Sequence, residues 1–145
     1  MSALLIAEHN NKEVKPFTFN AITAASQIDQ DLHVLVIGHS CETVAKSISE
    51  VPNVKKVIHV DDAIYENYLP ENFTPAVIKN SENYSHIVCS ANTFGKNLMP
   101  RIAALLPITN TCRSWSIWDA AVIAFKVKGL TSLLLCSAIN NTDII

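Results

Sequence analysis

The polar residues that could do chemistry in this sequence stand mostly where short apolar runs end. Asp61 and Asp62 directly follow one run, and paired carboxylates at such a place can bind a divalent metal. Adjacent aspartates after a strand also form turns and cap the next helix, and we favour this second interpretation because Asp is so common in those roles. His9 and His39 end two other runs, so they could approach each other at neighbouring strand ends. Without a nucleophile or an orienting carboxylate in a motif, the two histidines do not indicate general-base catalysis.

The thiol and hydroxyl side chains give no stronger signal. The cysteines are Cys41, Cys89, Cys112 and Cys136. None of them forms a CxxC pair or has a histidine at zinc-finger spacing, so the sequence predicts no structural metal site. Cys89 falls inside an apolar run and is expected in the core. Ser40 lacks the GxSxG context of a hydrolase nucleophile.

Four apolar runs are expected to form the strands that position these residues. The run LHVLVIG is nearly continuous rather than alternating, which is typical of a parallel strand covered on both faces. The expected strands are Ala3–Ala7, Leu32–Ile37, Lys56–Val60 and His86–Ser90.

Two helices are predicted between the first three strands. Apolar residues recur at helical spacing over Ala21–Ile28 and again over Val44–Val51, which marks one buried face in each segment. Ser40 stands just before the second segment and is expected to cap that helix.

Two further helices are predicted around prolines. Thr74 and Pro75 suggest an N-cap followed by proline at the first helical position, in a helix that ends before residue 84. Leu98–Leu106 carries the apolar face of a fourth helix, with Pro100 near its first turn and Pro107 at its end. Strands that alternate with helices predict an α/β fold: a three-layer, doubly wound and mostly parallel sheet, with ligands expected at the carboxyl ends of the strands.

Composition narrows the class of protein further. The 145 residues suit one domain, 49% are hydrophobic, and the net charge of −2 argues against a nucleic-acid partner. With 3 glycines the chain contains neither GxGxxG nor GxxxxGK(S/T), so it has no dinucleotide or P-loop fingerprint. The longest apolar stretch is shorter than the ~20 residues that span a bilayer, and the N-terminus has no signal or transit pattern. No membrane insertion is therefore expected.

The segment SANTFGKNLMPRIAALL combines a small-residue strand end, a glycine and polar side chains around one helix start. Small residues there allow close approach of a ligand or a neighbouring domain, and the free N–H groups of a helix start favour an anion. Alternatively, Lys96 and Arg101 are simply the solvated face of an amphipathic helix. The candidate domain or subunit contact residues are Phe94, Gly95, Lys96, Asn97, Pro100 and Arg101.

The same segment carries a family resemblance. FGKNLMPRIAALL after SAN, together with the opening LLIAEHNN, the helix FTFNAITAASQI and the segment NYLPENFTPAVI, resembles the N-terminal domain of the electron transfer flavoprotein alpha subunit. The resemblance covers about residues 3 to 107. It implies an adenine-nucleotide-hydrolase-like (Rossmann-like) fold.

The resemblance also implies a role. Members of this family are heterodimers of alpha and beta subunits that accept electrons from acyl-CoA and related dehydrogenases and pass them to a membrane quinone oxidoreductase. The N-terminal domain packs against the beta subunit and the rest of alpha. FAD is held chiefly by the C-terminal domain of alpha, and AMP belongs to the beta subunit. No cofactor or catalytic residue of the family maps onto this sequence.

After residue 107 the sequence departs from the family pattern. We expect one domain over residues 1–107 and a divergent tail over 108–145, whose apolar runs Ala121–Phe125 and Leu130–Ile139 could add two edge strands. This tail is expected to pack poorly. A frameshifted or truncated coding sequence and a genuine short variant would both explain the change.

These observations predict an assembly domain of an electron transfer flavoprotein alpha subunit, not an enzyme, that does not bind FAD by itself. The alternative is a stand-alone adenine-nucleotide-binding module that resembles universal stress proteins. The expected location is the cytoplasm of a bacterium, or the mitochondrial matrix if the protein is eukaryotic.

Overall fold

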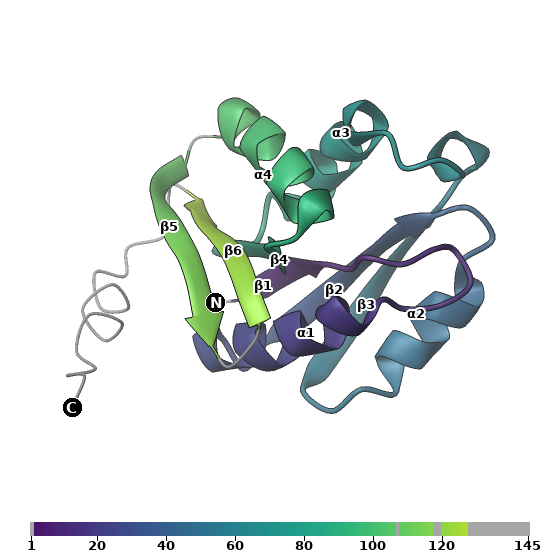
Figure 1. Cartoon of the computed structure of the whole chain (residues 1–145), viewed down its shortest axis with the longest axis horizontal. Coiled ribbons are helices and arrows are strands. Elements are labelled where there is room, and N and C mark those ends of the chain that lie inside the picture. Colours follow the sequence, from purple (N-terminus) through teal and green to yellow (C-terminus); the bar gives the residue numbers. More distant parts are fainter. Residues whose placement is uncertain (1, 107, 118–119, 128–145) are drawn as a thin grey trace.

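Six strands form a single sheet between two layers of helices (Figure 1). The computed structural model describes residues 2–106, 108–117 and 120–127, and the side chains of residues 108–121 and 125–127 are not described. The strand order across the sheet is β3-β2-β1-β4-β6-β5. In chain order the strands are β1 (Ala3–Ile6), β2 (Leu32–Gly38), β3 (Val54–Asp61), β4 (His86–Ser90), β5 (Ile108–Ile117) and β6 (Ala120–Val127).

Strand β1 is the centre of the parallel part of the sheet. Ala3 is in register with Leu32 of β2 on one side and with His86 of β4 on the other, and both pairings are parallel. From β1 the chain builds outward through β2 to β3, and it then returns to add β4 on the opposite side of β1. The winding therefore reverses between β1 and β4, and such a reversal leaves a crevice at the carboxyl ends of the strands.

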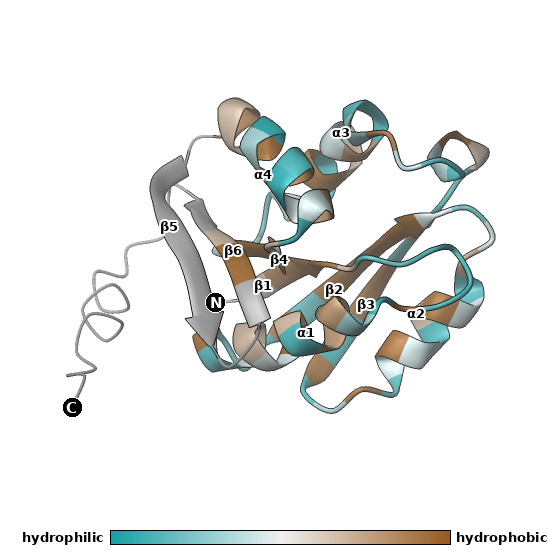
Figure 2. Ribbon diagram, viewed as in Figure 1, coloured by the Kyte–Doolittle hydropathy of each residue, from teal (hydrophilic) through white to brown (hydrophobic). Residues whose placement is uncertain are grey.

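The helices cover both faces of the sheet. In chain order they are α1 (Pro16–Ile28), α2 (Glu42–Ser49), the 3₁₀ turn η1 (Ala63–Tyr65), α3 (Pro70–Ser81) and α4 (Thr93–Leu105). Ile22 from α1 and Val44 from α2 lie in one cluster of buried side chains. Phe73 from α3 and Leu98 and Ile102 from α4 lie in the other. Figure 2 shows the result, with hydrophobic strands in the middle and helices of mixed character outside.

This architecture confirms the predicted three-layer α/β fold with a mostly parallel sheet. The four expected parallel strands and the helix faces over Ala21–Ile28 and Val44–Val51 are present. Burying each large apolar side chain of these faces is worth about 1.5–3 kcal/mol, so these faces hold the helices against the sheet.

The start of α2 differs from the prediction that Ser40 caps it. Ser40 has a left-handed φ of 53° and stands outside the helix, whose N-cap is Cys41. The carboxylate of Asp61, at the end of neighbouring β3, accepts hydrogen bonds from the Ser40 N–H (3.0 Å) and the Cys41 N–H (3.2 Å). The prediction is wrong because the cap comes from another element, which local sequence does not reveal.

Two proline positions are also different from the prediction. Helix α3 begins at Pro70 rather than Pro75, so Thr74 is not an N-cap; its hydroxyl donates to the Pro70 carbonyl within the helix (2.6 Å). Helix α4 begins at Thr93, which puts Pro100 in the helix interior rather than in its first turn. Burial of the apolar faces of both helices outweighs the hydrogen bond that each internal proline removes.

The chain after residue 107 continues the sheet. Strand β6 pairs antiparallel with β4, and β5 pairs antiparallel with β6 at the edge. Val122 and Ala124 of β6 are 3% and 8% exposed within the core, so the expectation of poor packing is wrong at these two positions. The predicted run Ala121–Phe125 lies in β6, while Leu130–Ile139 lies outside the described residues. The domain boundary at residue 107 stays a prediction.

Within the described part of the chain, none of the helices combines the length and the apolar character that crossing a membrane requires.

Candidate functional site

A cleft of about 490 Å³ opens at the point where the winding of the sheet reverses. Glu8 and His9, which follow β1, Ile37 at the end of β2, and Thr93 and Phe94 at the start of α4 line it. The loop between η1 and α3 lines it as well. The carboxyl ends of β1, β2 and β4 therefore converge on this cleft, as the sequence predicted for ligands of such a sheet.

Aromatic rings form one wall of the cleft. The ring centroids of Tyr68 and Phe94 lie 4.5 Å apart, and Phe73 packs edge-on against Tyr68 at 4.9 Å. The Tyr68 hydroxyl donates a hydrogen bond to the Phe94 carbonyl (3.2 Å). Burial raises the pKa of Tyr68, so this hydroxyl keeps its proton at neutral pH. The wall can stack against a flat apolar or aromatic group.

The polar side of the cleft is acidic. Asn92, the N-cap of α4, accepts from the Gly95 N–H (3.2 Å), and its amide donates to the Glu8 carboxylate. Glu66 adds a second carboxylate, and no Lys or Arg is among the described residues that line the cleft. Carboxylates repel a nearby phosphate group, so this lining is unfavourable for a phosphate.

The two histidines predicted to approach each other have different partners. His9 Nδ1 accepts from the Asn11 N–H (3.0 Å), and burial, the largest influence, lowers the pKa of His9. His39 Nδ1 instead lies 3.5 Å from Asp61 Oδ1. His9 is therefore neutral at pH 7. Among the described residues, His9 and His39 share no hydrogen bond through which a proton could pass.

Gly95 allows helix α4 to touch strand β4. A Cβ at this position would overlap the carbonyl oxygen of Ser90 and would lie 3.2 Å from Cys89 Sγ. The close backbone approach predicted for this segment is present, and it is an approach of helix to strand. Cys89 is fully buried there, as the sequence predicted.

The other predicted contact residues lie on the outer side of α4. Phe94 and Asn97 line the cleft. Lys96 and Pro100 are exposed. Arg101 makes an exposed ion pair with Glu71 of α3 (3.0 Å). These positions form one accessible surface, and their role as a domain or subunit contact stays a prediction.

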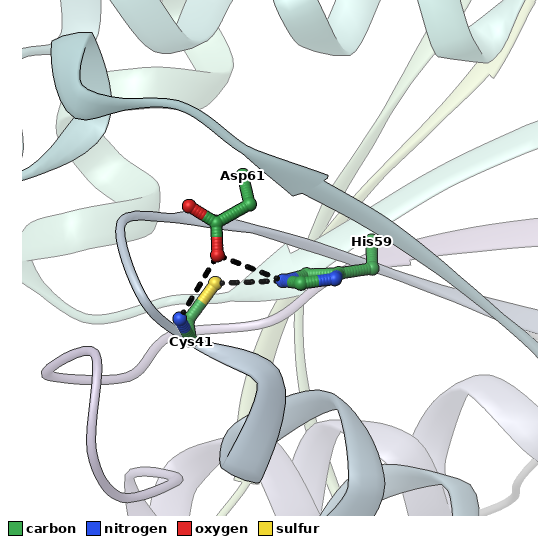
Figure 3. A group of neighbouring side chains, drawn as sticks. All are labelled: Cys41, His59 and Asp61. Atoms are coloured by element: carbon green, nitrogen blue, oxygen red, sulfur yellow. Dashed lines mark hydrogen bonds and ion pairs between the residues drawn. The ribbon is translucent and has the colours of Figure 1, made fainter.

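A second group of polar side chains lies beside the cleft, at the carboxyl end of β3 (Figure 3). Cys41 Sγ is 3.2 Å from His59 Nε2, and the same nitrogen is 3.5 Å from Asp61 Oδ2. His59 and Asp61 share one face of β3 because side chains two residues apart in a strand point the same way. This group is not evident from the sequence because Cys41 belongs to another element, although His59 and Asp61 show a His-x-Asp spacing.

The protonation states of this group follow from its surroundings. Burial, and after it the Asp61 carboxylate, raise the pKa of the Cys41 thiol. The hydrogen bond from the Ser40 N–H, followed by that of Cys41 and the two nearby histidines, lowers the pKa of Asp61. Asp62 is separate, since its carboxylate accepts from the Ile64 N–H (3.0 Å) and caps η1. The interpretation as a turn and a cap of the next helix is thus confirmed for Asp62, whereas Asp61 ends β3 and accepts from the start of the preceding helix α2.

The reversal of winding at β1, the helices on both faces and the cleft at the strand ends together define a Rossmann-like α/β domain. Residues 3–121 match the model of the electron transfer flavoprotein domain, so the chain belongs to the electron transfer flavoprotein family. The resemblance that the sequence carried is confirmed. The match extends past residue 107.

Three relatives that the chain matches are alpha subunits. The chain is 44% identical over 108 residues to the electron transfer flavoprotein subunit alpha of Pseudomonas aeruginosa, covering 74% of this chain and 35% of that protein. It is 38% identical over 127 residues to the mitochondrial alpha subunit of Dictyostelium discoideum, covering 82% and 36%. A probable mitochondrial alpha subunit of Caenorhabditis elegans is 35% identical over 111 residues, covering 75% and 33%. The chain spans about a third of the length of these relatives.

Proposed function

We propose that these 145 residues act as the N-terminal assembly domain of an electron transfer flavoprotein alpha subunit. In this role the domain packs against a beta subunit and against the flavin-binding part of alpha. The complex carries electrons from acyl-CoA-type dehydrogenases to the quinone pool. The observation that carries the proposal is the family match over residues 3–121.

FAD is proposed to bind elsewhere in the intact complex. Glu8 and Glu66 make the cleft of this domain unfavourable for a diphosphate. The thiol of Cys41 is buried and its pKa is raised, which is the opposite of an activated nucleophile. The domain therefore acts as part of a carrier and not as an enzyme.

The proposed contact surface joins the start of α4 to the loop before α3. Leu69 and Tyr68 are 50% and 36% exposed, which is high for large hydrophobic side chains. Tyr68 packs against the cleft residue Phe94. On the same helix as Phe94, Arg101 pairs with Glu71 of α3, and Lys96 is exposed. An apolar patch with a charged rim is typical of a protein–protein interface.

The test is complex formation with the beta subunit encoded in the same genome. We expect a 1:1 complex by size-exclusion chromatography with light scattering. The double variant Lys96→Glu/Arg101→Glu is expected to bind the beta subunit at least about tenfold more weakly, because it reverses two charges of the proposed contact surface. Lys46→Glu on α2, on the opposite face of the sheet, is the matched control.

Two results would count against this surface. One is the absence of a complex both with the beta subunit and with the flavin-binding part of alpha. The other is equal weakening by Lys46→Glu. Stoichiometric binding of FAD to the chain alone, seen as a change in flavin fluorescence, would overturn the proposal that FAD binds elsewhere.

The second candidate function is a stand-alone adenine-nucleotide-binding module. The Tyr68–Phe94 wall favours it, because an adenine ring can stack there. The acidic lining opposes it, because Glu8 faces the position of a phosphate at the start of α4. Calorimetry with AMP, ATP and adenosine separates the two functions: micromolar affinity for a nucleotide would favour the module.

We propose a reducing compartment for the protein, the cytoplasm in a bacterium or the mitochondrial matrix in a eukaryote. Support comes from Cys41 and Cys89, which are buried free thiols.

A further inference from the structure

Three different ligand atoms converge at the carboxyl end of β3. They are the sulfur of Cys41, a ring nitrogen of His59 and a carboxylate oxygen of Asp61, and all three lie within 4.8 Å of one another. Figure 3 shows that the side chains point toward a common centre from two elements, the start of α2 and strand β3. Sulfur, imidazole nitrogen and carboxylate oxygen are the three donor types that Zn²⁺ uses in proteins.

The spacing of these atoms matches a tetrahedral metal site. Bonds of about 2.0–2.3 Å to Zn²⁺ put neighbouring ligand atoms roughly 3.3–3.7 Å apart, since a tetrahedral edge is about 1.6 times the bond length. The observed separations are 3.2 Å between Cys41 Sγ and His59 Nε2 and 3.5 Å between that nitrogen and Asp61 Oδ2. The third pair, Cys41 Sγ and the Asp61 carboxylate oxygen, lies within 4.8 Å, so a metal could enter once this pair takes up a similar separation.

The geometry does not suit a nucleophilic triad. In a triad the histidine bridges, with one ring nitrogen on the nucleophile and the other on the carboxylate. Here Cys41 and Asp61 both face the same nitrogen of His59, Nε2. Cys41 is also fully buried, and its surroundings raise the pKa of the thiol instead of lowering it. Convergence on one point is what a shared cation requires.

The surroundings of Asp61 prepare the site. The N–H groups of Ser40 and Cys41 donate to its two carboxylate oxygens and fix the orientation of the group. Such outer contacts are usual around metal-bound carboxylates. His39 Nδ1 lies 3.5 Å from Asp61 Oδ1, is shielded from solvent and has no hydrogen-bond partner within the described residues. It is a fourth donor close to the same carboxylate.

We propose that Cys41, His59 and Asp61 bind one Zn²⁺ ion, with His39 or a water molecule as the fourth ligand. On binding, the bond between the Cys41 sulfur and its proton breaks, a sulfur–zinc bond forms and the proton leaves to solvent. The ion would join the start of α2 to the edge strand β3, so the site is structural.

Cobalt is the spectroscopic probe for the test. The whole 145-residue chain is treated with EDTA, dialysed and titrated with Co²⁺. We expect one Co²⁺ per chain, with visible bands of tetrahedral cobalt and a sulfur-to-cobalt charge-transfer band in the near ultraviolet. Added Zn²⁺ should abolish these bands by displacement. Absence of the charge-transfer band would overturn the proposal.

Matched variants identify the ligands. Cys41→Ala should abolish the charge-transfer band, whereas Cys89→Ala removes another fully buried thiol and should leave the band intact. His59→Asn should weaken cobalt binding at least about tenfold. His33→Asn should not, although His33 also stands beside an aspartate, with Nε2 3.3 Å from Asp31.

Stability provides an independent measurement. Zn²⁺ should raise the Tm of the wild type and of Cys89→Ala but not of Cys41→Ala, because only a ligand of the folded state stabilises it. His59→Asn covers the case in which Cys41→Ala fails to fold. A charge-transfer band that persists in Cys41→Ala, or an equal rise in Tm in every variant, would refute the assignment.

Discussion

Gly95→Ala tests the contact between helix α4 and strand β4. Two effects oppose each other. Alanine is the better helix former by at most about 1 kcal/mol, the value for a helix interior, whereas Gly95 lies in the first turn; this effect would stabilise the variant. Its Cβ, however, would overlap the Ser90 carbonyl oxygen and lie 3.1 Å from the carbonyl carbon of the same residue. Backbone atoms cannot escape by changing rotamer, so the helix itself must move.

The size of that movement decides whether the variant is more or less stable than the wild type. An ordinary carbon–oxygen contact is about 3.3 Å, so the start of α4 must shift by about an ångström or more. The shift disturbs Leu98, Met99 and Ile102, which are fully buried on the next turns. Overpacking of this kind costs about 3 kcal/mol when the core cannot adjust, and subtracting the helix propensity leaves a net loss of about 2 kcal/mol.

Urea unfolding followed by circular dichroism measures this loss. With an m-value near 2 kcal/mol per molar, the unfolding midpoint of Gly95→Ala should fall by about 1 M. Asn97→Ala, at an exposed position of the same helix, carries a propensity gain without a clash and should lie within about 0.5 kcal/mol of the wild type. A Gly95→Ala protein as stable as the wild type would show that the reasoning from close packing is wrong.

Three further outcomes are expected. Leu98→Ala should lower the free energy of unfolding by about 3 kcal/mol, as measured in urea, because a fully buried leucine leaves a cavity; a loss below about 1 kcal/mol would contradict the packing. With EDTA present, the free energy of unfolding of the wild type should fall relative to that of His9→Asn as the pH falls from about 7 to 5, because burial lowers the pKa of His9 in the folded state and the unfolded state therefore binds the proton first. Parallel curves of unfolding free energy against pH for the two proteins would refute this. Cys89 should resist iodoacetamide at pH 8 until the chain unfolds, since burial raises its pKa to about 12; mass spectrometry of peptides from the native protein would detect any early labelling.

Much of the fold could be predicted from local patterns. The continuous run LHVLVIG became β2, buried along most of its length, because parallel strands with helices on both faces require apolar side chains throughout. The edge strand β3 was also predicted, although it is partly exposed and its two lysines face solvent. Strand β5 (Ile108–Ile117) was missed because polar residues interrupt its sequence and its antiparallel pairing with β6 is nonlocal.

Helix starts were harder to predict than helices. Asn92 caps α4 from the position just before the helix, and such a cap is a local signal. The prediction of this helix start depended on Pro100 instead. The acceptor at the start of α2 is Asp61, which lies at the end of a different strand and reaches the Ser40 and Cys41 N–H groups only once β2 and β3 pair. A sequence pattern contains only the residues near a helix start, so it does not reveal an acceptor that another element provides.

The sequence by itself determined the layers, the buried faces of the helices and the family, because periodicity and local motifs are properties of neighbouring residues. Only the tertiary structure decided which polar groups meet. Cys41 Sγ and His59 Nε2 lie 3.2 Å apart because β2 and β3 are parallel neighbours whose carboxyl ends lie at the same edge of the sheet. The cleft at Glu8 and Phe94 likewise exists because β4 returns to the far side of β1. Strand order is set by the packing of the whole chain, and for that reason the chemistry at the strand ends could be recognised only in three dimensions.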